Sequence, residues 1–138
     1  MLAAYYSKYC ITMEGSFGNT ITPISGVENV KQGDHVTLQC NYTGAVIILQ
    51  WYRQYPGQAL EYLLMSFEMG GGSKANEEEH RISAELDKDN NRVFLKLIDT
   101  EVTDAAVYYC ALSPTVTETH PALYTNYLTL TYKLLFTN

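Results

Sequence analysis

The chain has 138 residues, of which 46% are hydrophobic and 17% are charged, and its formal net charge is -6. This length and balance favour one globular domain over a disordered chain. The negative charge argues against a nucleic-acid partner, because phosphate binding needs a basic face. No apolar run approaches the roughly 20 residues that a membrane-spanning helix needs. Aromatic residues reach 12%, mostly tyrosine, which favours β-strands.

Hydrophobic residues alternate in twos along the chain, which predicts half-buried strands. The clearest segments, in chain order, are "HVTLQC", "LQWYRQ", "RVFLKL" and "AVYYCA", while "RISAEL" fits a strand as well as a helix. Turn residues separate them at 33–34, 56–57, 70–72 and 89–91. Short strands at this spacing predict an antiparallel β-sandwich. The expected inward residues are Val36, Leu38, Cys40, Leu49, Trp51, Ile82, Ala84, Leu86, Val93, Leu95, Leu97, Ala106, Tyr108 and Cys110.

Three cysteines have neither the spacing nor the histidine partners of a zinc site. Cys40 and Cys110 are far apart in sequence and face inward, which indicates a bridge across the fold and an oxidising compartment. Trp51 faces inward on the strand after Cys40, and Tyr108 precedes Cys110 by two residues. This Cys–Trp–Cys pattern with a tyrosine corner is typical of immunoglobulin domains. Cys10 is expected to have no partner.

Two stretches carry a closer resemblance: "WYRQYPG" at 51–57 and "DAAVYYCAL" at 104–112. Together with "VTLQC" and "RISAEL" they resemble a T-cell receptor variable domain, best the alpha chain, in a form like that of bony fish. The resemblance covers residues 19–112. It implies an all-β V-type sandwich of two antiparallel sheets, with Cys40 and Cys110 as the intradomain disulfide and the tryptophan as its packing partner.

The resemblance also assigns roles to polar and aromatic residues. Arg81 and Asp104 match the pair that forms a salt bridge at the lower end of such domains, and its energetic worth depends on burial. A second set matches the face that pairs with the other receptor chain: Tyr52, Gln54, Leu60 and Tyr109. A tyrosine-rich solvated face is the alternative, but the enrichment of tyrosine in interfaces favours pairing.

Three antigen-recognition loops are implied at one end of the sandwich, where binding loops of this fold lie. The first is "GAVII" at 44–48, the second is "SFEMGGGS" at 66–73, and the third begins after the second core cysteine. The residues assigned to them are Gly44, Ala45, Val46, Ile47, Ile48, Ser66, Phe67, Glu68, Met69, Ala111 and Leu112.

Asn41-Tyr42-Thr43 is a sequon for N-glycosylation. The motif permits the modification without requiring it, so an unmodified asparagine at a strand end is the alternative.

No constellation of residues predicts catalysis. "GGGSK" has neither the residue order nor the glycine spacing of a phosphate loop. "DKDNN" begins like a calcium loop, but Arg92 stands where glycine is required and Ile98 where a bidentate glutamate is required, so we predict a hairpin turn. The histidines are scattered and lack a nucleophile and an orienting acid. We therefore expect no enzyme, no metal site and no cofactor.

The tail, residues 115–138, departs from the resemblance. Such domains continue into a final strand with a Phe-Gly-X-Gly bulge, but the tail contains no glycine, so we expect this final strand to be missing or replaced. Thr115-Val116 stands where the recombination signal after an unrearranged gene segment would be translated. The sequence thus predicts an incomplete leader or non-native segment at 1–18, a V-type domain at 19–114 and translated flanking sequence in the tail. We expect the tail to dock weakly or not at all, although "YLTLTYKLL" alternates.

The implied function is binding at the cell surface. As part of a full receptor chain, such a domain pairs with a beta-type chain and recognises peptide presented on a histocompatibility molecule. Associated chains would signal through constant and membrane regions outside this sequence. The alternative is a domain of an innate immune-type or adhesion receptor of the immunoglobulin superfamily.

Overall fold

The computed structural model describes residues 3–5, 19–114, 128–133 and 135–137. Cys10 and residues 115–127 lie outside this described part of the chain. A short 3-10 helix, η1, spans Val102–Asp104. The strands are β1 (Ala3–Tyr5), β2 (Thr20–Pro23), β3 (Val36–Thr43), β4 (Val46–Gln54), β5 (Glu61–Phe67), β6 (Gly72–Lys74), β7 (Ile82–Asp87), β8 (Arg92–Leu97), β9 (Val107–Pro114), β10 (Leu128–Lys133) and β11 (Leu135–Thr137).

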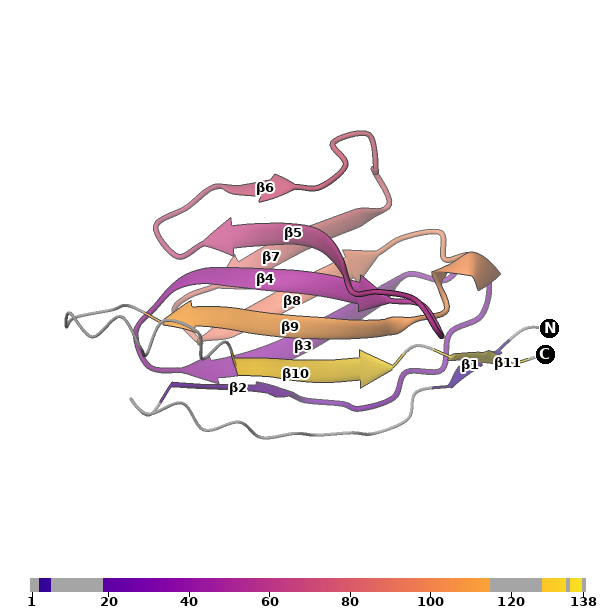
Figure 1. The fold of residues 1–138 in the computed structure, drawn as a ribbon, viewed down its shortest axis with the longest axis horizontal. Helices are drawn as coiled ribbons and strands as arrows, with labels where there is room; N and C mark the ends of the chain where they lie inside the picture. The colour runs from indigo at the N-terminus through magenta and orange to yellow at the C-terminus, as the bar shows by residue number, and fades with distance from the viewer. Residues whose placement is uncertain (1–2, 6–18, 115–127, 134, 138) are drawn as a thin grey trace.

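Two antiparallel sheets lie face to face and form the sandwich expected from the sequence (Figure 1). The five-stranded sheet has the order β10-β9-β4-β5-β6, and the four-stranded sheet has the order β2-β3-β8-β7. A separate two-stranded sheet joins β1 to β11 near the chain ends (Figure 1).

Alternation along the strands fills the space between the sheets. In β3 every second residue from Val36 is buried, and β8 buries Val93, Leu95 and Leu97. The segment that fitted either helix or strand is β7, whose Ile82 is buried. The predicted strands are therefore confirmed, because a period of two places apolar side chains on one face of a sheet.

The core is linked covalently across the two sheets. The sulfur atoms of Cys40 on β3 and Cys110 on β9 are 2.03 Å apart, and their Cα atoms are 6.7 Å apart. Trp51 lies opposite Cys110 in the β4–β9 ladder. All three side chains have no exposed surface, and Leu38, Leu95 and Tyr108 belong to the same buried cluster. The predicted disulfide is confirmed.

The tail contains a strand that we expected to dock weakly or not at all. Instead, β10 pairs with β9 along its whole length, from Leu128 opposite Leu112 to Lys133 opposite Val107. It also lies beside β2, at the side of the sandwich where the two sheets meet (Figure 1). The expectation was wrong because an open β9 edge offers unpaired backbone groups, and a segment rich in threonine, tyrosine and leucine can pair with them without a glycine bulge.

Candidate functional site

Half-buried tyrosines and glutamines gather on the outer face of the five-stranded sheet. Tyr52 on β4 lies opposite Tyr109 on β9, and Gln54 follows Tyr52 by two positions on the same strand. The Tyr109 hydroxyl donates a 2.6 Å hydrogen bond to Oε1 of Gln54. Partial burial raises the pKa of Tyr109 above its ordinary value of 10.0, so its hydroxyl remains a donor at neutral pH. The structure therefore brings together three residues of the predicted pairing face.

Two further residues extend this surface. The Tyr52 hydroxyl donates to Oε1 of Gln50 at 3.0 Å, and its ring meets Tyr62 of β5 edge-on, with centroids 5.8 Å apart. The sequence pattern does not single out Tyr62, because its place beside Tyr52 depends on the pairing of β4 with β5. We call these residues the tyrosine face: Gln50, Tyr52, Gln54, Tyr62 and Tyr109.

Leu60, the fourth residue predicted for pairing, directly precedes β5 and is 48% exposed. It adds apolar surface at the beginning of a strand that carries the tyrosine face. Partly exposed aromatic rings with fixed polar groups suit a protein interface, since their side chains lose little freedom on binding.

Seven of the residues assigned to recognition loops lie in strands, two of them, Ser66 and Phe67, at the end of β5. Val46, Ile47 and Ile48 begin β4, and Ala111 and Leu112 continue β9. Val46, Ala111 and Leu112 are at most 2% exposed, and Val46 and Leu112 belong to the hydrophobic core between the sheets. The assignment by resemblance was wrong here, because backbone pairing between β4 and β9 continues as far as Pro114 and draws both segments into the sheet.

The first loop is reduced to a tight turn at Gly44 and Ala45. Gly44 has φ +86°, and a Cβ there would lie 1.7 Å from Oδ1 of Asn19. Only glycine meets both requirements, since L-residues rarely adopt this backbone conformation and Asn19 is itself buried. The turn is therefore a constrained structural element.

The second loop is the tip of the β5–β6 hairpin. Ser66 and Phe67 end β5, and Glu68 and Met69 form the turn. The Phe67 N–H donates to the Gly71 carbonyl at 3.0 Å, so the turn is closed by the backbone. Phe67 is 36% exposed and Met69 is 99% exposed. This tip, the β3–β4 turn and the end of β9 lie at one end of the sandwich (Figure 1).

A charged network occupies the opposite end. Arg81 donates to both carboxylate oxygens of Asp104, at 2.8 and 3.1 Å, and Asp104 is 2% exposed. The same carboxylate accepts the Glu101 N–H at 2.7 Å, and the Tyr108 hydroxyl donates to the Asp104 carbonyl at 2.8 Å. The hydrogen bond to Asp104 raises the pKa of Arg81, and burial raises the pKa of Tyr108. This pair anchors the tyrosine corner rather than a catalytic site.

Asp104→Ala is expected to lower the free energy of unfolding by about 2 kcal/mol, between the cost for an exposed pair and that for a fully buried pair. Arg81 would lose its bidentate partner but would keep access to water, since 27% of its side chain is exposed. Urea titration measures the change. The control is Glu85→Ala, which removes the exposed ion pair with Lys96 and should cost less than about 1 kcal/mol. Equal losses in the two variants would contradict the anchoring role.

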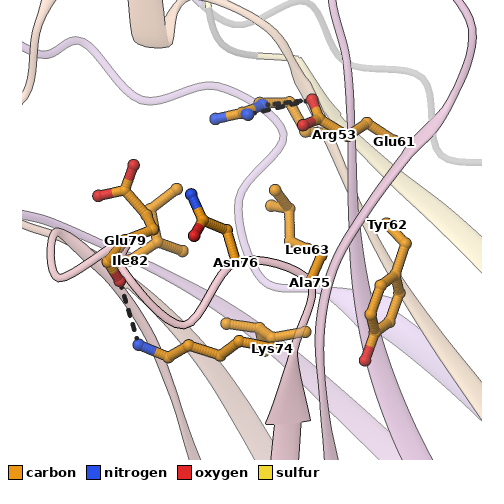
Figure 2. A pocket seen from close by; sticks show the side chains of 10 residues that line it. Arg53, Glu61, Tyr62, Leu63, Lys74, Ala75, Asn76, Glu79 and Ile82 are labelled. Carbon is orange, nitrogen blue, oxygen red and sulfur yellow. Dashed lines mark hydrogen bonds and ion pairs between the residues drawn. The ribbon is translucent and has the colours of Figure 1, made fainter.

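A small hollow between β5 and the segment joining β6 to β7 is the other charged feature (Figure 2). Its volume is about 80 Å³, far below the roughly 300–1,000 Å³ of small-molecule sites. Arg53 is paired with Glu61 at 3.0 Å, and Lys74 donates to the Glu79 carbonyl at 3.2 Å. The charged side chains of Arg53 and Lys74 that line the hollow therefore already have partners within the protein.

Among the described residues, no group of three histidine, cysteine, aspartate or glutamate side chains is placed to hold a metal ion. In the same part of the chain, no helix is long and apolar enough to cross a membrane. Within the described part of the chain, the tyrosine face and the loop end of the sandwich are two surfaces that suit binding.

The comparisons with known proteins agree with the β-sandwich and the disulfide described above. The immunoglobulin V-set domain family matches residues 25–128. The chain is 32% identical to human T cell receptor alpha variable 8-6 over 103 residues, which are 74% of this chain and 88% of that relative. It is also 32% identical to human T cell receptor alpha variable 9-2 over 99 residues, 70% of this chain and 83% of that relative. A mouse protein, Ig heavy chain V region MOPC 315, is 35% identical over 91 residues, 63% of this chain and 66% of the relative. The chain belongs to the immunoglobulin V-set family and fits the T cell receptor alpha variable type within it.

Proposed function

We propose that this protein is an antigen-recognition domain that pairs with a beta-type T cell receptor variable domain through the tyrosine face and binds peptide presented on a histocompatibility molecule. The observation that carries the proposal is the tyrosine face itself, together with the alpha-type relatives. V-set domains are in general not enzymes, and the role is binding. Signalling belongs to associated chains of the full receptor at the cell surface.

The chemistry of the tyrosine face supports pairing. The Tyr109 hydroxyl and the Gln54 side-chain oxygen are already joined by a hydrogen bond. Burying the two side chains against a partner therefore leaves fewer polar groups without a hydrogen bond. The edge-on contact between the rings of Tyr52 and Tyr62 restricts the rotamers of both side chains before a partner binds. Less side-chain entropy is therefore lost on binding. A partner with a similar apolar and polar mixture would complete the interface.

The loop end supports recognition of a second ligand. Met69 and Phe67 project apolar surface from a hairpin tip that contains glycines with φ above +80°. Methionine is unbranched and adaptable, and suits contact with varied surfaces. Met69 lies beyond the end of β5, whereas the tyrosine face runs along β4, β5 and β9, so each surface can contact a different partner.

Tyr109→Arg is expected to weaken pairing with a beta-type variable domain by about tenfold or more, because a charge without a partner would be buried at the interface. Titration of the two purified domains, by calorimetry or analytical ultracentrifugation, measures the change in Kd. The matched control is Phe94→Arg, since Phe94 is a half-buried aromatic residue in β8 of the other sheet.

Both variants must retain the disulfide and the melting temperature of the native domain for this comparison. We expect Phe94→Arg to pair as the native domain does. If Phe94→Arg loses pairing and Tyr109→Arg retains it, the interface lies on the four-stranded sheet and the proposal is wrong.

A further inference from the structure

We propose that Asn41 carries an N-linked glycan, and that this glycan covers the outer face of the four-stranded sheet. Asn41-Tyr42-Thr43 is the only Asn-X-Ser/Thr triplet in the sequence, and its middle residue is not proline. The part of the proposal that concerns pairing rests on the proposed function. The modification itself does not.

The sequon lies in β3, where strand alternation leaves the side chains of Asn41 and Thr43 exposed to solvent. Tyr42 points into the core and is 2% exposed, whereas Asn41 and Thr43 are exposed on the outer face. Oδ1 of Asn41 accepts a 2.8 Å hydrogen bond from Nε2 of Gln39, on the same face. A glycan on Asn41 can therefore extend into solvent without moving a core side chain.

The surroundings of Asn41 are compatible with a hydrophilic cover. Asn41 lies between Thr22 of β2 and Arg92 of β8 in the ladder. Further along the same sheet, Lys96 and Glu85 form an exposed ion pair. Phe94 is half-buried on this face, opposite Gln39, and the face bears none of the tyrosine-face residues, so a glycan here leaves the five-stranded sheet open.

The disulfide gives an independent reason to expect modification. A bridge between Cys40 and Cys110 forms in an oxidising compartment such as the secretory lumen. Asparagine in an Asn-X-Ser/Thr triplet is the glycosylation acceptor of secreted proteins. A chain that acquires the disulfide thus passes through conditions in which the sequon can be used.

The reaction requires a lipid-diphosphate-linked oligosaccharide as donor. The Asn41 amide nitrogen Nδ2 forms a bond to C1 of the first sugar and releases one of its two protons to the solvent. The C1–O bond to the diphosphate breaks, and the lipid diphosphate leaves with the electron pair. No atom is oxidised or reduced.

Translation of the full chain behind a cleavable signal sequence, in the presence of microsomes, tests the modification. Among protease-protected chains, we expect one mobility shift that peptide N-glycosidase F removes, converting Asn41 to aspartate. Asn41→Gln and Thr43→Ala should abolish the shift. Thr43→Ser should retain it, since serine keeps both the sequon and the hydroxyl that lies 2.6 Å from the hydroxyl of Thr20. Protected chains with no shift would overturn the proposal.

Binding of the glycosylated chain to a beta-type domain tests which sheet face the glycan covers. We expect the glycosylated chain and the Asn41→Gln chain to bind a beta-type domain within about twofold of each other, because a glycan on the far sheet leaves the interface free. If the glycan blocks pairing and Asn41→Gln restores it, the sequon is used but the assignment of a covered far face is overturned. If neither chain pairs, the proposed function fails while the glycosylation result stands.

Discussion

Replacing both core cysteines, as Cys40→Ala with Cys110→Ala, is expected to lower the free energy of unfolding by about 4 kcal/mol. The bridge joins residues 70 positions apart, so it restricts a long loop of the unfolded chain. Both cysteine side chains have no exposed surface and belong to the same hydrophobic core as Trp51. A domain of this size has about 5–15 kcal/mol in total, so the double variant should be marginally stable.

Urea titration of the double variant and of the reduced native chain measures this contribution. The two should lose similar amounts of stability, because both lack the covalent link while the rest of the core is nearly unchanged. A loss below about 1 kcal/mol in the reduced chain would show that packing alone specifies the sandwich. A much larger loss in the double variant than in the reduced chain would assign the difference to the cavity left by the sulfur atoms.

The sequence predicted the core strands because burial of one strand face leaves a period of two in the residues. Leu38, Cys40 and Trp51 could be assigned inward from that period alone. The period did not predict Val46, which is out of phase with Leu49 and is buried nevertheless. The pairing of β4 with β9 shifts register between Val46 and Ile48, and this irregularity reverses the phase. Such a shift depends on the neighbouring strand, so local sequence does not reveal it.

The candidate site shows the same division between local and long-range information. Outward placement of Tyr52, Gln54 and Tyr109 follows from alternation within two segments. Their hydrogen bond and ring contact depend on which strands become neighbours, and the β4–β5 ladder changes register between Trp51 and Tyr52. Family resemblance supplied the pairing of Arg81 with Asp104, which composition and spacing alone could not identify. The same resemblance placed Ala111 and Leu112 in a loop, although β9 continues through them.

The tail was the main error, and the reason concerns backbone rather than side chains. The missing glycine bulge predicts a final strand that is missing or replaced, and from it we expected weak docking of the tail. Pairing of β10 with β9 needs only free backbone groups on both strands and a compatible register, which places Leu130 opposite Cys110. Selection for packing is not required for a strand-forming segment to occupy an open edge.

Deleting residues 115–138 is therefore expected to lower the free energy of unfolding by about 3 kcal/mol, comparable to a large truncation in a core. Removing β10 leaves β9 as an edge strand and opens the side of the sandwich beside β2. The exposed edge should also make the truncated domain associate at high concentration. A thermal melt and sedimentation velocity on the same samples measure both effects.

The matched control is truncation after Lys133, which keeps β10 and removes β11. Since β11 pairs with β1 alone among the described strands, in a sheet outside the sandwich, this deletion should change stability by less than about 0.5 kcal/mol. If the longer deletion also changes stability by less than about 1 kcal/mol and leaves a monomer, β10 contributes nothing to the sandwich, and the hypothesis that residues 115–138 are translated flanking sequence gains support. If the longer deletion destabilises the domain and the shorter one does not, β10 acts as the final strand of the five-stranded sheet despite lacking the glycine bulge.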